Sequence, residues 1–301
     1  MTSSSTGTLS CLGSSAAFGA MAVLGKLAYA EGATVGTLLS LRFALAAAVF
    51  WALIGARGEP RALRGRDVAA ALALGACGYA AQAGAAFGAL ARIDASLLSL
   101  LLYTFPAIVM IAAIGLGRER ADRRRVAALA LTSGGLVLVV AGAGTGALDP
   151  LGTSLALAAA VLHGAYILIS EGLAARLRSR VLAALVCTGA ALTLTGGSAL
   201  LGELRPGELT PTGWVWVASI AGVSTVAAIG LFFAGLRRVG PTTASILSTV
   251  EPVITVLLAF AVFGEALGAV QLLGGALVLS AVLALHGVTV TIPRRRLRVT
   301  G

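Results

Sequence analysis

Four ionisable side chains stand inside long runs of apolar residues, where a charge is costly and therefore informative. Lys26, Arg42, His163 and Glu251 are each flanked by mostly apolar sequence. On membrane-insertion scales a charged residue at the centre of an apolar helix costs about 2.5–3.5 kcal/mol, so such residues are by default candidates for binding sites, ion pathways or proton relays. Glu251 is the first of these candidates.

Glu251 immediately precedes Pro252 near the middle of its apolar run. Proline has no amide hydrogen, so Pro252 leaves the carbonyl of Ser248 without its helical partner and kinks the helix. A carbonyl and a carboxylate exposed at one kink can contact a polar solute or carry a proton. The alternative is that Glu251 only bonds a neighbouring helix and stabilises packing. We expect Pro252, and Pro106 in the first half of the chain, to act as hinges.

The other three ionisable residues leave alternatives open. Lys26 lies in the outer part of its run, where its ammonium meets a substrate carboxylate or extends to the membrane interface. Arg42 is expected to form a structural pair. His163 is a candidate proton carrier, since imidazole titrates near neutral pH, although a single histidine in a helix is more often a hydrogen-bonded core residue.

Polar aromatic residues form a second group at similar depth in their runs. Tyr79 and Gln82 are three residues apart and so share a helix face, as do His163 and Tyr166. Tyr103 lies near the middle of another run. Rings with hydroxyl tips suit amphipathic solutes such as amino acids, although each tyrosine could equally pack against a neighbouring helix.

The composition shows what must position these residues. Of the 301 residues, 58% are hydrophobic and 11% charged, and the mean hydropathy is +0.98, which excludes a water-soluble fold. A membrane-spanning helix needs about 20 apolar residues. The chain is therefore predicted to be an all-α polytopic membrane protein with ten spans, at residues 8–30, 33–55, 67–91, 94–116, 124–143, 151–174, 181–201, 213–236, 241–263 and 266–289.

Basic residues predict the orientation of these spans. With both termini in the cytoplasm, 18 of the 22 basic residues fall in cytoplasmic loops or the C-terminal tail, whereas Arg92 and Arg205 alone lie on the opposite side. This asymmetry follows the positive-inside rule. Because membrane topology accounts for the net charge of +10, we expect no binding of nucleic acid.

The two halves of the chain resemble each other. Residues 87–119 align without gaps on residues 233–265, with nine identities in 33 positions, and near the N-terminus the offset is 145. Five spans per unit is an odd number, so the second copy must be inverted relative to the first. We predict repeats at residues 1–145 and 146–301. The matched serines either line a cavity or allow close packing, and the matched pairs are Ser99 with Ser245, Pro106 with Pro252, and Glu119 with Glu265.

These residues resemble the EamA family of the drug/metabolite transporter superfamily. The resemblance rests on the Phe18-Gly19 and His163-Gly164 pairs, on Leu41-Arg42-Phe43, and on a mid-span proline followed by Arg118-Glu119 in one half and Gly264-Glu265 in the other. It covers nearly the whole chain. It implies a carrier of two inverted five-helix repeats around a central cavity, of a kind that commonly exports amino acids or other small metabolites from bacteria.

We therefore expect a monomeric secondary transporter in the lipid bilayer of the bacterial inner membrane, which exports a small molecule, first of all an amino acid. The proton is a candidate coupling ion, and no cofactor or metal is expected. An enzyme is disfavoured because there is no HExxH motif, cysteine cluster or paired carboxylate. A flippase, a carrier of another metabolite class and a channel remain alternatives. The predicted substrate site comprises Tyr79, Gln82, Tyr103, His163, Tyr166, Ser245, Glu251 and Lys26.

Overall fold

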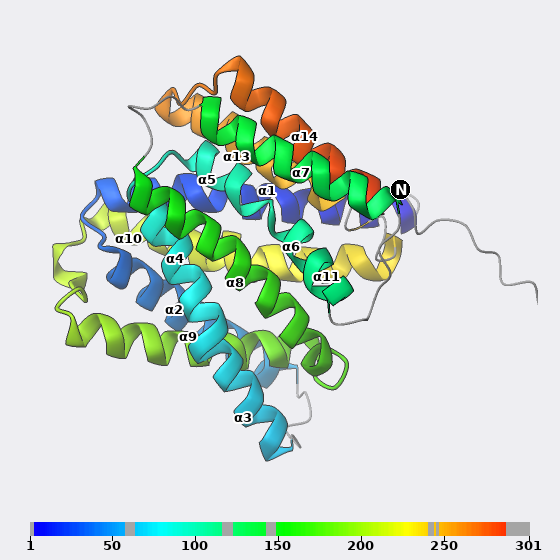
Figure 1. The fold of residues 1–301 in the computed structure, drawn as a ribbon. Coiled ribbons are helices and arrows are strands. Elements are labelled where there is room, and N and C mark those ends of the chain that lie inside the picture. Colours follow the sequence, from blue (N-terminus) through cyan, green and yellow to red (C-terminus); the bar gives the residue numbers. More distant parts are fainter. Residues whose placement is uncertain are drawn as a thin grey trace, which may run out of the picture.

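A computed structural model describes residues 3–57, 64–115, 123–142, 149–239, 244 and 247–286, which form helices joined by turns (Figure 1). The first repeat contains α1 (Ser3–Ala30), α2 (Val35–Ala56), α3 (Gly65–Ala73), η1 (Leu74–Tyr79), α4 (Ala80–Leu90), α5 (Ala95–Leu102), α6 (Phe105–Gly115) and α7 (Arg123–Gly142). The second contains α8 (Pro150–Ala174), α9 (Ser179–Leu200), η2 (Pro206–Glu208), α10 (Pro211–Ala221), η3 (Gly222–Ala227), α11 (Ala228–Val239), α13 (Val250–Phe263) and α14 (Ala269–His286).

Seven helical segments in the described ranges are long and apolar enough to cross a membrane, and three shorter apolar helices accompany them. Three of the seven join several elements, at Gly65–Leu90, Ala95–Ala112 and Pro211–Val239. Large apolar side chains are exposed on the outside of the bundle, among them Leu192, Phe260 and Ile169. Such a surface suits lipid rather than water. The all-helical membrane fold predicted from composition is confirmed.

The two helices that contain the predicted hinge prolines are interrupted just before them. Tyr103 and Thr104 form a turn between α5 and α6, and Pro106 is the second residue of α6. In the second half, Thr249 lies in a turn just before α13. Pro252 is the third residue of α13 and is buried. The predicted fourth span is therefore two short helices rather than one. Whether these breaks act as hinges remains a prediction.

Two π-helical turns lie at corresponding places in the two repeats. The turn η1 interrupts the helix formed by α3 and α4, and η3 interrupts the helix formed by α10 and α11. Tyr79 is the last residue of η1, and Thr225 lies inside η3. The two residues are 146 positions apart, which equals the offset between the repeats. Single π turns occur frequently at functional sites. Hydrophobic patterning does not reveal them, and they were not expected.

Helices of the two repeats are interleaved. The helix α1 packs against α11 and α13 of the second repeat, and α8 packs in the same way against α4 and α6 of the first. The repeat-related helices α2 and α9 contact each other, as do α7 and α14, which run side by side along one edge (Figure 1). Every cavity between the repeats is therefore lined by both.

Two glycines show that the symmetry extends to single residues. A Cβ atom added to Gly19 of α1 would lie 2.8 Å from the carbonyl oxygen of Glu251 and 3.1 Å from Ile254. Gly164 of α8 faces the repeat-related residues Phe105 and Ile108 of α6, at 3.7 and 3.5 Å. Small residues let transmembrane helices approach closely. At Gly19 this approach fixes the backbone that carries Glu251.

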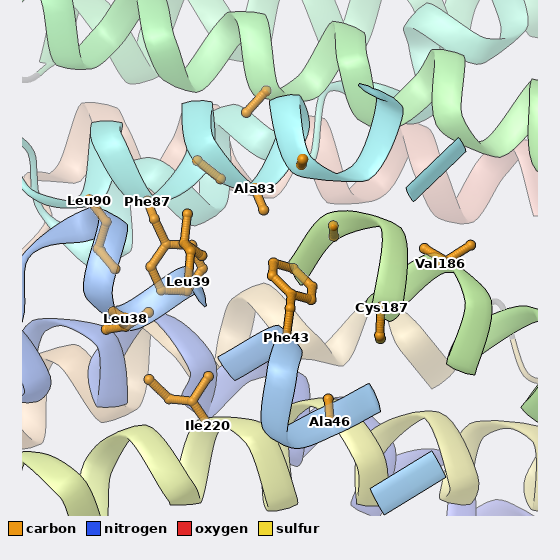
Figure 2. Packing of buried hydrophobic residues seen from close by; sticks show 14 of the residues in the cluster. Leu38, Leu39, Phe43, Ala46, Ala83, Phe87, Leu90, Val186, Cys187 and Ile220 are labelled. Atoms are coloured by element: carbon orange, nitrogen blue, oxygen red, sulfur yellow. The ribbon is translucent and has the colours of Figure 1, made fainter. Parts of the chain in front are cut away.

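The best-packed core surrounds α2. Phe43 and Leu38 are fully buried. Figure 2 shows α2 between α4, which contributes Ala83 and Phe87, and α10, which contributes Ile220, with Cys187 of α9 beside Phe43. This packing fixes the first residues of the site, because Arg42 is the neighbour of Phe43 in α2.

Candidate functional site: a central cavity between the repeats

A cavity of about 470 Å³ lies between the two repeats. Pockets for small molecules commonly have volumes of 300–1,000 Å³, with apolar and aromatic walls and a few polar groups. This cavity has that character, with Phe18 and Met21 of α1 opposite Leu182 and Val186 of α9. Six of the predicted site residues line it together, namely Tyr79, Gln82, Tyr103, His163, Tyr166 and Glu251.

Five aromatic rings form a continuous track along the cavity wall. Tyr79 stacks on Tyr166 with ring centroids 5.0 Å apart, and Tyr166 lies 6.4 Å from His163. His163 meets Phe105 edge to face at 4.6 Å, and Phe105 meets Tyr103 at 5.7 Å. Within the described part of the chain, the buried Nδ1 atom of His163 has no hydrogen-bond partner. The faces and edges of this track can hold an apolar or aromatic side chain.

Glu251 lies at one end of the aromatic track. The Tyr103 hydroxyl is 2.9 Å from the Ser248 carbonyl and 3.1 Å from Oε2 of Glu251. The Ser248 carbonyl is the group that Pro252 deprives of its helical donor, and Tyr103 replaces that donor. The hydroxyl has one proton, so it can donate to the carbonyl when Glu251 is protonated or to the carboxylate when Glu251 is ionised. Glu251 thus couples charge to the hydrogen bonding of a helix break.

Arg42 also lines the cavity, beyond the other end of the aromatic track. Its side chain is almost completely buried, and its guanidinium lies 4.8 Å from the Phe43 ring and 5.2 Å from the Phe87 ring. Nε donates to the Thr225 hydroxyl at 3.1 Å. Within the described ranges, no aspartate or glutamate lies within ion-pair distance of Arg42. The structural pairing expected for Arg42 takes the form of its hydrogen bond to Thr225. Its place inside an apolar run was the signal that could have placed it in the site.

Lys26 does not line the cavity. Its Nζ lies 2.7 Å from Glu265 and 3.4 Å from Asp94. Glu265 also accepts hydrogen bonds from the amides of Ala95 and Ser96 and from the Ser96 hydroxyl. We call these five residues the Lys26–Glu265 cluster. It links α1 and α5 of the first repeat to the segment between α13 and α14 of the second.

The cluster determines the electrostatics of Glu265. Burial raises the pKa of this carboxyl, but the hydrogen bonds from Lys26, Ser96 and Ala95 outweigh burial, so the pKa lies below its usual value of 4.5. The amides belong to the first turn of α5, whose N–H groups have no partner within the helix and favour a negative charge. Glu265 is therefore ionised and joins two repeats at one end of the cavity.

The lining residues show where the two ends of the cavity lie. Leu98 of α5 lines it one helical turn from Ala95, so this end of the cavity lies near the Lys26–Glu265 cluster. At the other end the lining reaches Ser179, the first residue of α9. Arg176 and Arg178 lie just before Ser179. The cavity therefore reaches from the neighbourhood of the Lys26–Glu265 cluster toward an arginine-rich end of the bundle.

The other predicted residues divide between the cavity and its supports. Ser99 lines the cavity, whereas its repeat mate Ser245 lies outside the described residues. Pro106 and Pro252 do not line the cavity, but they follow the helix breaks beside Tyr103 and Glu251.

Comparisons with known proteins agree with this arrangement. The model of the EamA-like transporter family matches twice, at residues 5–141 and 150–286. A segment of 70 residues is 37% identical to an uncharacterized transporter of Archaeoglobus fulgidus and covers 23% of this chain and 26% of that protein. A protein of known crystal structure shares the fold, with a TM-score of 0.63 and 23% identity over 93% of this chain and 96% of the other.

The two family matches extend over nearly all of the chain, and each covers one of the two interleaved repeats. Together with the apolar helices this makes the protein an integral membrane protein of a transporter family. The protein belongs to the EamA-like transporter family, and hence to the drug/metabolite transporter superfamily.

Proposed function

We propose that this protein is a secondary transporter that exports a small metabolite, and first of all an amino acid, by alternating access. The observation that carries the proposal is the cavity between the repeats, which presents a carboxylate, a guanidinium and an aromatic wall to one enclosed space. Sites of secondary transporters lie near the bilayer midplane at the interface of such repeats. The export direction follows from the family resemblance.

Alternating access is supported by the asymmetry of the cavity. The Lys26–Glu265 cluster joins the two repeats through polar contacts near the α5 end of the cavity, whereas the lining at the other end reaches Ser179. Polar contacts of this kind can be exchanged, whereas an apolar core resists rearrangement. Rocking of one repeat against the other, with the breaks beside Pro106 and Pro252 as hinges, would open the cluster and close the arginine-rich end.

The proposed orientation puts the arginine-rich end and both termini in the cytoplasm of a bacterium, with ten spans in the inner membrane. Arg57, Arg64, Arg176 and Arg237 all lie at helix ends or in turns, where the positive-inside rule acts. Reporter fusions after residue 301 that are active only outside the cytoplasm would overturn the orientation.

Glu251 is proposed to bind the substrate amine or a coupling proton. Either event changes the charge of Glu251 and so the hydrogen bond that Tyr103 makes to the broken helix. A bound cation favours ionised Glu251, whereas a proton favours the arrangement in which Tyr103 bonds the Ser248 carbonyl. Binding is thus linked to the backbone at the proposed hinge.

A flux screen tests the function. The purified protein is reconstituted into proteoliposomes, and the vesicles are loaded with labelled amino acids, organic acids or amines. Efflux is measured with and without an imposed proton gradient. The proposal expects saturable efflux of at least one amino acid, and acceleration by the same amino acid on the opposite side. Non-saturable flux without this acceleration would indicate a channel, and saturable flux of non-amino-acid solutes alone would indicate a different carrier. Transfer of a labelled lipid between leaflets would indicate a flippase.

A further inference from the structure

We propose that Arg42 is the carboxylate-binding residue of the cavity, so that the substrate carries a carboxylate toward Arg42 and an amine toward Glu251. This inference rests on the proposed function and specifies its substrate class. Both residues line the same cavity. Within the described ranges, neither has an oppositely charged side chain within ion-pair distance.

The guanidinium is held in a fixed orientation. Thr225 of the π turn η3 donates its hydroxyl hydrogen to the carbonyl of Ile220 in α10, five residues earlier, at 3.0 Å. Its oxygen is therefore directed as an acceptor toward Nε of Arg42. The rings of Phe43 and Phe87 contact the guanidinium as well. The N–H at Nε is committed to Thr225, and the Tyr79 hydroxyl also interacts with the guanidinium. The N–H groups that remain suit a carboxylate with two parallel hydrogen bonds.

Both π turns contribute to this placement. Thr225 of η3 accepts from Arg42, and Tyr79 at the end of η1 lies close enough to interact electrostatically with both Arg42 and Glu251. A regular α-helix would move these side chains around the helix axis, because a π turn inserts one extra residue. Repeat-related π turns thus converge on one cation, which explains why both interruptions lie at the depth of the cavity.

The aromatic track sets the shape of the substrate between the two charges. It begins at Tyr79, which meets Phe43 beside Arg42 at 5.2 Å, and it ends at Tyr103 beside Glu251. A zwitterion can contact both charges while its side chain lies along the track. A simple amine or a simple carboxylate would leave one buried charge without a partner, which is costly. The cavity is therefore expected to select for both groups together.

Binding measurements on matched ligands test Arg42. Calorimetry compares L-phenylalanine with phenethylamine, which lacks the carboxylate, and 3-phenylpropanoate, which lacks the amine; L-leucine, isopentylamine and 4-methylpentanoate form a second set. We expect Arg42→Gln to weaken binding of the amino acid and the carboxylate by about 10- to 100-fold, the usual effect of losing a charge-assisted hydrogen bond. Binding of the amine should change less than about twofold.

Control variants keep the test decisive. Lys26→Gln removes a cation outside the cavity and should affect all three ligands equally. If Arg42→Gln does not fold, Arg42→Lys keeps the charge but loses the fork, and Thr225→Val keeps Arg42 but removes its acceptor. Both should weaken carboxylate-containing ligands selectively. Equal weakening of all ligands, or none, in the variants that fold would overturn the role of Arg42.

The outcomes separate this inference from the proposed function. Amino-acid flux with ligand-independent effects of the Arg42 variants would overturn the inference and leave the function standing. Arg42-dependent binding of carboxylates in a protein that transports no amino acid would support Arg42 as a carboxylate site and refute amino-acid export.

Discussion

The Lys26–Glu265 cluster and the central cavity differ in whether their charged side chains are paired with each other. In the cluster, Lys26 is paired with two carboxylates, and Glu265 accepts four hydrogen bonds, including the one from Lys26. In the cavity, Arg42 and Glu251 face a shared space without an ionic partner among the described residues. Charges that satisfy each other hold helices together, whereas charges that remain available can hold a ligand.

Substitution of Glu251 should reduce transport more than any other change, because Glu251 is one of the two charges that remain available in the cavity. Glu251→Gln should reduce flux by on the order of 100-fold, because truncating one partner of a buried charge contact typically costs 2–5 kcal/mol. Folding should persist, since the amide keeps the shape and much of the hydrogen bonding. Proteoliposome flux and thermal stability are measured on one preparation. Full flux would remove Glu251 from the mechanism, and an aggregating variant would make it structural.

Glu265→Gln should show the reverse pattern. We expect a loss of about 1.5–3 kcal/mol in stability, the value of a hydrogen bond to a charged group, with substrate affinity changed little. Asp94→Asn is the matched control, because Asp94 is 66% exposed and a surface ion pair contributes at most about 1 kcal/mol. Thermal unfolding in detergent measures both variants. Unchanged stability of Glu265→Gln would contradict a locking role for the cluster.

The same carboxyl predicts a pH dependence. The folded-state pKa of Glu265 lies below its usual 4.5, so its contribution to stability is present above pH 4.5 and is lost as the pH falls through the lower, folded-state value. The unfolding temperature of the parent should therefore drop in this acidic window. Glu265→Gln should lack this part of the drop. Identical acid profiles would show that Glu265 is not linked to folding.

Two repeat-related glycines, Gly19 and Gly164, should respond differently to substitution by alanine. Gly19→Ala should destabilise by about 1–3 kcal/mol through overpacking, since its Cβ would meet the backbone carbonyl of Glu251 at 2.8 Å. A Cβ atom added to the repeat-related Gly164 would lie 3.3 Å from its nearest neighbour, a Val109 methyl group. Alanine also has a helix propensity about 1 kcal/mol more favourable than that of glycine. Gly164→Ala should be neutral or stabilising. Equal effects in thermal unfolding would show that the two contacts are equivalent.

The smallest expected effect distinguishes two tyrosine hydroxyls. Tyr103→Phe removes the hydroxyl beside Ser248 and Glu251 and should cost about 1 kcal/mol, the usual value of one hydrogen bond, together with a measurable loss of flux. Tyr29 does not line the cavity, so Tyr29→Phe, which removes its hydrogen bond to the Phe87 carbonyl, should cost similar stability without loss of flux. Equal flux in both variants would separate Tyr103 from the transport cycle.

Six polar or aromatic residues of the cavity could be predicted from the sequence, because membrane insertion makes charge and polarity costly. That cost singled out Glu251 and His163, and helical spacing placed Tyr79 with Gln82 and His163 with Tyr166. The self-comparison fixed the repeat register, which the contacts of Gly19 and Gly164 reproduce. Proline chemistry also predicted the unpaired Ser248 carbonyl, although it could not name Tyr103 as the new donor.

Hydropathy, the internal repeat and the prolines predicted the class of fold and the approximate depth of the polar residues, because these signals act locally along the chain. They could not predict which charges pair, since pairing depends on contacts between residues far apart in the sequence. Lys26 meets Glu265 across 239 positions, and Arg42 meets Thr225 across 183. The same local patterns therefore describe a lysine that pairs with Glu265 outside the cavity and an arginine that lines the cavity, and only three-dimensional packing distinguishes the two.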